Sequence, residues 1–400
     1  MGLQFLLQGL PGIMVKPLSD AFNISLTQVG VLSSSMIYLY IILQAPAGKI
    51  ASFYGEKFCL VIASGSLAVL CLLFTVVSTY TSAVIIRMLM GVAAAPGVVC
   101  VMLLISRWFS ARSFAFIAGV WEAVNMVIAA SGPVFMSKVV NTHGWKTVLL
   151  LIAGICVVVL IMNVLIVTNA PEGYEAEKDD MPEEKTEESG GWQAKNPFFR
   201  LIKNVSFVSN CVFILGLFSV VNVFASLWGI PFMRAAYPEH SLEATQAISF
   251  VFIGLAIGAP LTGAIASYIN RLRLIMFWCA LITLLCLTVL FYYPVSFKVA
   301  GGILFILGVS ASAYMLPFSA IRRDIPPALL YLANAILNAA SLLAAPLFQP
   351  LIGKILDLHS QHAVQLTMEN FQVALLPLYI IVCVAIFSLI WIKENKMYSQ

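Results

Sequence analysis

The chain has 400 residues, of which 61% are hydrophobic and only 10% are charged, and its mean hydropathy is +0.98. Soluble domains carry roughly 25% charged residues, so this composition excludes an ordinary soluble globular protein. A chain this apolar needs lipid around it. The formal net charge of +4 is less informative than the way the charges are distributed.

The eight cysteines all fall within apolar runs, and none has the C-x-x-C spacing of a metal or redox site. We therefore expect small buried hydrophobic side chains rather than disulfides or metal ligands. The sequence predicts no bound metal and no cofactor. The positions are 59, 71, 100, 156, 211, 279, 286 and 383.

Twelve apolar runs predict twelve transmembrane helices, because within hydrocarbon each backbone polar group must be satisfied inside its own segment. The first run is short for a span of about 20 residues, so we expect a misplaced start codon or a shortened first helix. No cleavable signal peptide is expected there. The runs are 1–18, 29–50, 58–78, 81–106, 114–140, 147–169, 205–230, 243–269, 273–293, 297–320, 328–353 and 371–392.

The positive charges predict the orientation of these helices. If both termini are cytoplasmic, 15 of the 22 Lys and Arg residues lie in inner segments and six in outer loops, while Arg87 lies within a helix. Cytoplasmic loops carry an excess of Lys and Arg, so we expect both termini inside.

A polar break at 171–203 separates six apolar runs from the other six. It contains nine acidic residues and five Lys or Arg residues, without an apolar period. We expect a solvated cytoplasmic linker, and the break carries no nucleic-acid or phosphate-binding motif. The predicted organisation is an N-terminal half at 1–170, the linker at 171–203, a C-terminal half at 204–393 and a cytoplasmic tail at 394–400.

The two halves read as a repeat. The charged stretch Gly48–Lys57, predicted to be a short turn, has a near-copy at Gly263–Arg273, and both contain Ile-Ala-Ser followed by an aromatic residue. Likewise Trp121–Phe135 aligns with Asn334–Phe348, which pairs an asparagine, a proline and a phenylalanine in each copy. Two parallel six-helix halves predict a pseudo-two-fold axis along the membrane normal and a substrate site near the midplane.

With these features the chain resembles the major facilitator superfamily over essentially its whole length. The stretch from Gly48 resembles the loop signature G-x-x-x-D-R-x-G-R-K/R, with Ser52 and Phe53 replacing the usual Asp-Arg pair. The fourth run resembles the motif R-x-x-x-G-x-x-x-A, beginning at Arg87. By this resemblance the expected gating residues are Gly48, Ser52, Gly55 and Lys57, with Gly263, Ser267 and Arg271 in the second copy.

The resemblance implies an all-α integral membrane transporter of twelve helices, not an enzyme, that works by alternating access. Ser131–Pro133 lacks the glycine run of the antiporter motif, which favours import. Leu227–Phe232 and Gln349–Asp357 are similar to bacterial nutrient importers, nearest the phagosomal amino-acid transporters and a lysosomal dipeptide carrier. The implied solute is an amino acid, a short peptide or a similar nutrient, and the implied location is the bacterial inner membrane, in contact with lipid and as a monomer.

Two ionisable residues lie well inside predicted helices, where charges are costly and default to functional candidates. Glu122 is a candidate proton carrier, because removal from water disfavours its charge. The alternative is a packing carboxylate that is hydrogen-bonded to a neighbour. Arg87 is a candidate for binding an anionic group of the substrate, for proton coupling or for closing the outer gate, and the alternative is a cap on nearby carbonyl groups.

The remaining candidate substrate-binding residues are amides and aromatics. Gln4 and Gln8, like Asn334 and Asn338, are four residues apart and share a helix face. A face with two amides is costly against lipid, so it should point to a cavity or to another helix, where the amides would join helices. The candidates are Gln8, Tyr38, Asn125, Asn222, Trp228, Tyr314, Asn334, Asn338 and Gln349.

Trp228 is followed by Gly229 and Pro231, which we expect to break the helix at its outer end. A broken helix that lines a cavity is a candidate gate. The alternative is a tryptophan of the interfacial aromatic belt.

The sequence thus predicts a secondary importer of a small polar solute, coupled to H⁺ through Glu122. The alternatives are an uncoupled facilitator, a carrier of sugars or organic anions, and a membrane sensor that binds solute without turnover. Asn338→Leu should raise the apparent KM if that residue binds substrate.

Overall fold

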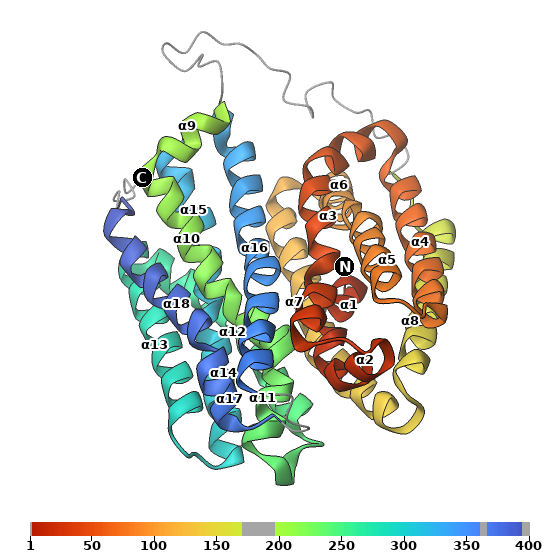
Figure 1. Cartoon of the computed structure of the whole chain (residues 1–400). Helices are drawn as coiled ribbons and strands as arrows, with labels where there is room; N and C mark the ends of the chain where they lie inside the picture. The colour runs from red at the N-terminus through yellow and green to blue at the C-terminus, as the bar shows by residue number, and fades with distance from the viewer. Residues whose placement is uncertain (1, 170–196, 270, 361–365, 394–400) are drawn as a thin grey trace.

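A computed structural model of the chain describes residues 2–169, 197–269, 271–360 and 366–393. Within them the side chains at 45, 48, 49, 52, 111, 112, 114–116, 118, 267, 323, 327, 328 and 331 are not described. These residues form helices and short connections, without a strand among them. The helices gather into two groups, one built from the N-terminal part of the chain and one from the C-terminal part (Figure 1).

The N-terminal group contains eight helices, several of which continue one another to cross the molecule. They are α1 (Gly2–Ile13), α2 (Val15–Phe22), α3 (Leu26–Tyr54), α4 (Glu56–Val76), α5 (Tyr80–Ala94), α6 (Pro96–Trp108), α7 (Ala111–His143) and α8 (Trp145–Leu165).

The C-terminal group includes a π-helical segment, η1, between α10 and α11. Its elements are α9 (Pro197–Lys203), α10 (Val205–Ser219), η1 (Val220–Trp228), α11 (Gly229–Ala236), η2 (Pro238–His240), α12 (Ala244–Ile269), α13 (Leu272–Tyr292), α14 (Phe297–Ala311), η3 (Ser312–Met315), α15 (Leu316–Asp324), α16 (Pro327–His359), α17 (Met368–Ala374), α18 (Leu376–Ser388) and η4 (Leu389–Trp391).

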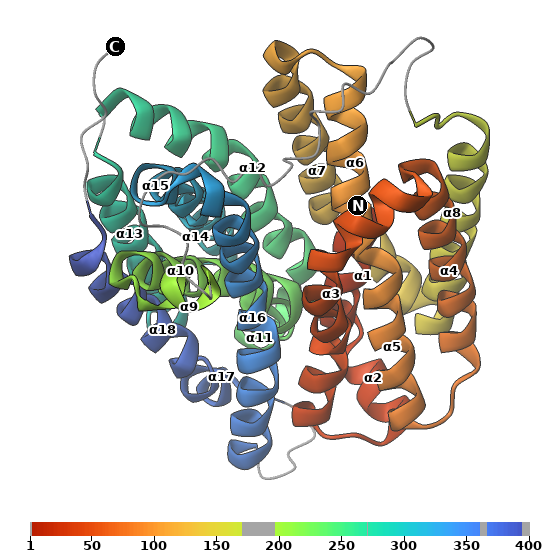
Figure 2. The ribbon, with the colours of Figure 1, turned by 90° about the horizontal axis from the view of Figure 1, so that it is seen from above.

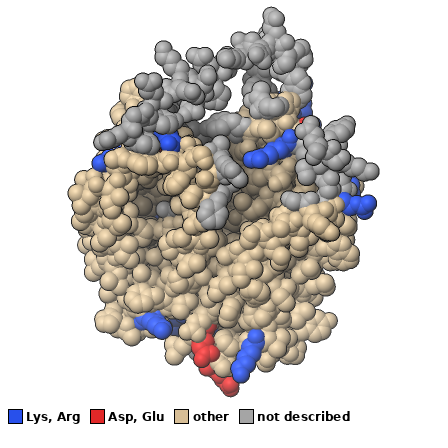
Figure 3. Space-filling view, turned by 180° about the vertical axis from the view of Figure 1, so that it is seen from behind, with Lys and Arg blue, Asp and Glu red and all other residues tan. Residues whose placement is uncertain are grey.

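Eleven helical segments of the described chain are long and apolar enough to cross a membrane, and they correspond to the second to twelfth predicted runs. The first run forms α1 and α2, of 12 and 8 residues. The prediction of an all-α membrane fold with twelve helices in two halves is confirmed. The space-filling view agrees, because charged side chains gather at the two ends of the molecule and leave an uncharged band between them (Figure 3).

The internal repeat is visible in the helix lengths. Helices α4 and α13 both have 21 residues, α5 and α14 both have 15, and α7 and α16 both have 33. It is also visible in the packing. A Cβ at Gly91 would collide with the Met36 carbonyl oxygen, and one at Gly308 would collide with that of Val251, so equivalent glycines bring equivalent helices into close contact.

The two groups meet most extensively along three pairs of elements. Helix α3 packs on α16, α7 packs on α12, and α1 packs on η1. Seen from above, α16 lies beside α3 and α12 lies near α7 (Figure 2). We call the end of the molecule at Tyr54 and Asp324 the inner end, following the predicted orientation, and the end at Leu26 and His359 the outer end.

Two expectations about local structure need correction. The stretch Gly48–Lys57 is not a turn, because α3 continues to Tyr54 and Gly55 alone separates it from α4, with φ of 85°. In the second copy, α12 likewise continues to Ile269. Ala, Ile, Phe and Tyr at these positions extend the helices beyond the apolar run, since none of them ends a helix.

At the end of the predicted linker, Pro197–Lys203 forms the short helix α9, while 171–196 lies outside the described residues. The helix break at Gly229 is also displaced. The chain widens into the π-helical η1 before that glycine, and Pro231 lies in the first turn of α11, where its missing N–H costs little.

Candidate functional site

A cavity of about 40 Å³ lies between the two halves, with room for about three water molecules. Helices α1 and α7 supply its wall on the N-terminal side, and α10, η1, α11 and α12 supply the wall on the other side. Its lining is largely apolar. Five lining side chains are polar but uncharged: Gln8, Asn222, Ser226, Thr245 and Ser249.

Two of these polar groups have no hydrogen-bond partner. The Gln8 Nε2 atom and the Thr245 Oγ1 atom are buried and unpartnered, and Thr245 is only 2% exposed. Buried polar atoms in native structures are nearly always paired with protein, water or ligand. The two residues belong to different halves and lie in opposite walls of the cavity.

The π-helical wall of the cavity is held by Gln349 of α16. The Gln349 Nε2 atom donates to the Asn222 carbonyl oxygen at 2.8 Å and to Ser226 Oγ at 3.3 Å, while Asn222 Nδ2 donates to the Leu342 carbonyl at 3.3 Å. A π-helix leaves carbonyl groups differently placed from those of an α-helix, and such segments are frequent at functional sites. Here two predicted site residues, Asn222 and Gln349, come together.

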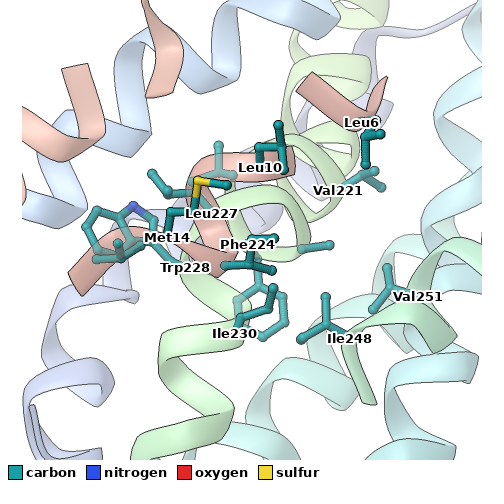
Figure 4. Packing of buried hydrophobic residues seen from close by; sticks show 14 of the residues in the cluster. Leu6, Leu10, Met14, Val221, Phe224, Leu227, Trp228, Ile230, Ile248 and Val251 are labelled. Atoms are coloured by element: carbon teal, nitrogen blue, oxygen red, sulfur yellow. The ribbon is translucent and has the colours of Figure 1, made fainter. Parts of the chain in front are cut away.

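Trp228, at the end of η1, is fully buried, and its Nε1 atom donates to the Gln349 carbonyl at 3.1 Å. This burial is unlike the interfacial belt position considered as its alternative. The α1 side chains Leu6, Leu10 and Met14 pack against this part of η1 (Figure 4). Trp228 therefore joins α11, α16 and α1 at the wall of the cavity without lining it.

Arg87 does not line the main cavity. Its guanidinium donates to the carbonyl oxygens of Leu7, Ser33 and Leu32, at 2.9, 2.9 and 3.4 Å, and the residue is 4% exposed. It borders a smaller cavity of about 20 Å³ that is otherwise apolar. These contacts are those of the structural alternative, in which Arg87 joins α1 to α3 and α5.

Glu122 is half-buried on α7, beside Asn125 and near Tyr314 of the other half. Asn125 is 3% exposed, and its Nδ2 atom has no partner within hydrogen-bond distance. The Tyr314 ring lies 4.6 Å from that of Phe218, a residue of the cavity wall. Glu122, Asn125 and Tyr314 thus lie towards the inner end from the cavity.

Helix α16 brings another predicted amide to the interface between the halves. Asn338 Nδ2 donates to Gln44 Oε1 of α3 at 2.7 Å. Asn334, one turn closer to the inner end, is half-buried, and so is Tyr38 on α3, and neither lines the cavity. The pairing with Gln44 connects the two halves directly.

At the outer end the halves are joined by Asp357 of α16. Its carboxylate accepts hydrogen bonds from Leu26 N at 2.9 Å, from Thr27 N at 2.8 Å and from Thr27 Oγ1 at 2.6 Å. The backbones also touch, because a Cβ at Gly30 would lie 2.5 Å from the Gln349 carbonyl oxygen, and one at Gly353 would collide with that of Leu26. The outer ends of α3 and α16 are therefore closed against each other.

At the inner end of the N-terminal half, Glu56 and Arg107 form an ion pair of 2.6 Å, in which the Glu56 side chain is fully buried. It joins the start of α4 to the end of α6. Of the predicted gating residues, Gly55 separates α3 from α4, and the Lys57 N–H donates to Asn169 Oδ1 at 2.8 Å.

The other predicted gating residues lie in or beside helices. Gly48 and Ser52 belong to α3, Gly263 and Ser267 belong to α12, and Arg271 is exposed just before α13. The side chains of Ser52 and Ser267 lie outside the described residues. No group of three metal-ligating side chains occurs in the described part of the chain.

The arrangement of two helical groups around a shared cavity agrees with the match of the chain to a family model. The model of the Major Facilitator Superfamily matches residues 1–348. The chain belongs to the Major Facilitator Superfamily. It is therefore a membrane transporter, and the members of that family move small molecules. No curated protein matches the chain in sequence.

Solved transporters share the fold of this superfamily member. A bacterial homologue of the human lysosomal transporter Spinster, in an inward-facing and unoccupied conformation, has a TM-score of 0.77 at 14% identity, over 98% of this chain and 95% of its own. The nucleoside transporter NupG has a TM-score of 0.75 at 14% identity, over 99% of this chain and 97% of its own. At this identity the likeness is one of fold alone.

Four further features of the structure are not predicted from the sequence: Thr245, Gln44, Asp357 and the pair of Glu56 and Arg107. A signal existed only for Glu56, a carboxylate that replaces an arginine of the loop signature. Threonine in an apolar run gives no such signal, because its hydroxyl commonly bonds to its own helix.

Proposed function

We propose that this protein is a secondary active transporter that imports a small polar solute by alternating access. The observation that supports this most directly is the cavity lined by both halves, with unpartnered Gln8 on one side and Thr245 on the other. In this fold a site between two parallel halves is exposed to either side as the halves rock. Asp357 joins the two halves at the outer end, and this contact must break when the site opens to the outside.

Amino acids, short peptides and similar nutrients are the solutes that the sequence resemblance favours. The support is the resemblance of Leu227–Phe232 and Gln349–Asp357 to nutrient importers. The fold shared with NupG adds nucleosides to the solutes worth testing. Sugars and organic anions are the remaining classes.

For the coupling ion we propose H⁺, carried by Glu122. The carboxylate is half-buried at the interface, beside Asn125 and near Tyr314 of the other half. A carboxylate that changes its exposure as the halves rock can bind a proton on one side and release it on the other. The excess of Lys and Arg at the inner end supports an orientation with both termini in the cytoplasm. We propose the bacterial inner membrane from the resemblance to bacterial nutrient importers. We propose a monomer, since the cavity is lined by the two halves of a single chain.

The experiment that tests this function is uptake of labelled amino acids, dipeptides, nucleosides, sugars and organic anions into proteoliposomes, with and without an inward proton gradient. Accumulation that needs the gradient supports the proton symporter. Equilibration without accumulation indicates an uncoupled facilitator. Binding without flux would contradict the proposal and indicate a solute sensor.

Glu122→Gln tests the coupling residue. We expect the variant to lose proton-driven accumulation but to keep exchange of solute across the membrane, because the amide cannot release a proton. Glu239→Gln, at an exposed carboxylate in an outer loop, is the matched control. Unchanged accumulation in Glu122→Gln would show that this carboxylate has a structural role.

A further inference from the structure

The main cavity presents hydrogen-bonding groups but no ionisable side chain. Its polar lining consists of two amides and three hydroxyl groups. The Ser226 hydroxyl donates to the Asn222 carbonyl, and the Ser249 hydroxyl donates to the Gln246 carbonyl. Gln8 Nε2 and Thr245 Oγ1 are buried and have no hydrogen-bond partner.

The two charged residues nearest this region do not supply a counter-ion to the cavity. The Arg87 guanidinium is committed to three backbone carbonyls of α1 and α3, and it borders a different cavity. Glu122 lies closer to the inner end and is not part of the lining. A charged group placed in the cavity would therefore lose its hydration without gaining an opposite charge, which is costly.

An uncharged solute meets no such penalty. The lining contains three phenylalanines, Phe5, Phe218 and Phe252, which offer flat apolar surfaces. Gln8 Nε2 is a donor, and the Thr245 hydroxyl both donates and accepts. At about 40 Å³ the cavity is smaller than a typical ligand pocket, so a whole solute needs the halves to part, as alternating access provides.

We propose that the cavity binds an uncharged polar solute, whose carbonyl or hydroxyl oxygen accepts a hydrogen bond from Gln8 and whose second polar group bonds to Thr245. The inference rests on the proposed transport function and narrows its substrate class to neutral molecules. Because Gln8 and Thr245 belong to different halves, the bound solute bridges them. A zwitterion or an anion lacks a counter-charge at this site.

The test measures proteoliposome uptake of labelled uridine, D-glucose, L-alanine, L-alanyl-L-alanine and succinate by the wild type and four variants. The first two solutes are uncharged, and the others carry charges. Thr245→Val and Gln8→Leu remove the two free groups, while Thr245→Ser keeps the hydroxyl. Thr75→Val makes the same change as Thr245→Val on α4, far from the cavity, where the hydroxyl bonds to its own helix.

We expect uptake of uridine or D-glucose and not of the charged solutes. Thr245→Val and Gln8→Leu should each raise the apparent KM about tenfold, as expected for the loss of one hydrogen bond. Thr245→Ser and Thr75→Val should remain within about twofold of the wild type. Thermal unfolding of each purified variant identifies any that fails to fold.

Two results would overturn this inference while transport itself stands. One is uptake of L-alanine, the dipeptide or succinate in preference to the neutral solutes. The other is uptake of a neutral solute with an unchanged KM in both Thr245→Val and Gln8→Leu. Absence of flux for every solute class would instead overturn the proposed function, and this inference with it.

Discussion

The Asp357 carboxylate and the Thr27 side chain form a 2.6 Å hydrogen bond between positions 330 residues apart in the chain. The same carboxylate accepts the N–H groups of Leu26 and Thr27, which are among the free donors of the first turn of α3. A helix of one half is thus capped by a residue of the other. The negative charge also opposes the positive end of the α3 dipole.

Asp357→Ala should shift the protein towards a state that is open at the outer end. The change removes three charge-assisted hydrogen bonds, and a net loss of about 3 kcal/mol corresponds to a shift of about a hundredfold in the ratio of closed to open molecules. Spin labels at the exposed residues Ala21 and His359 report the distance between the outer ends of the halves. We expect a second, longer distance in the variant.

The matched control for this change is Glu239→Ala, which removes an exposed acidic side chain at the same end. Its distance distribution should equal that of the unsubstituted labelled protein. Identical distributions for Asp357→Ala and the control would mean that the hydrogen bonds do not hold the outer end closed.

Gly353→Ala should have a similar effect through sterics alone. The added methyl group would collide with the Leu26 carbonyl oxygen, which has little freedom because it belongs to the first turn of α3. The same spin-label pair should show a lengthened distance, and uptake should slow. Gly302→Ala is the control, since no atom lies within 4 Å of a Cβ at that position. Equal behaviour of the two variants would contradict the close contact.

The helices, the repeat and part of the site could be predicted from the sequence because they depend on local composition. Long apolar runs must become helices in lipid, and paired amides four residues apart must face away from it. Gln8, one of such a pair, and the amide Asn222 are both predicted from the sequence, and both line the cavity. The role of Arg87 could not be decided, because it depends on which carbonyl groups the fold places beside it.

Contacts between distant segments also could not be predicted from the sequence. Asp357 looks like an ordinary residue at the end of a helix until α3 is placed against α16. The same holds for Thr245, whose free hydroxyl is evident only when its neighbours are known. The turn predicted at Gly48–Lys57 failed for a different reason. The charges there mark the end of the membrane and not the end of the helix, which continues to Tyr54.

Arg107→Ala should destabilise the N-terminal half. It leaves the fully buried Glu56 carboxylate without its partner, which typically costs about 3 kcal/mol or more. The Arg107 side chain is 28% exposed, so we expect the lower end of that range. Thermal unfolding of the purified protein in detergent measures the effect.

A second variant separates charge from packing at this pair. Glu56→Gln combined with Arg107→Ala should recover part of the lost stability, because the buried charge is then absent. Arg271→Ala, at an exposed arginine of the same end, should leave the unfolding temperature unchanged. A loss in Arg107→Ala no greater than in Arg271→Ala would show that the ion pair contributes nothing.

The hydrogen bond from Asn338 to Gln44 joins the two halves. Single and double substitutions of these residues distinguish this role from contact with the substrate. Asn338→Leu should raise the apparent KM for uptake about three- to tenfold, because one hydrogen bond at the interface is lost and Gln44 Oε1 is left unpaired. Gln44→Leu should do the same. The double variant should be no worse than either single variant, since both remove the same bond. Gln246→Leu, at an exposed amide of α12, should leave uptake unchanged. Additive effects of the two substitutions would mean that Asn338 acts on the solute independently of Gln44.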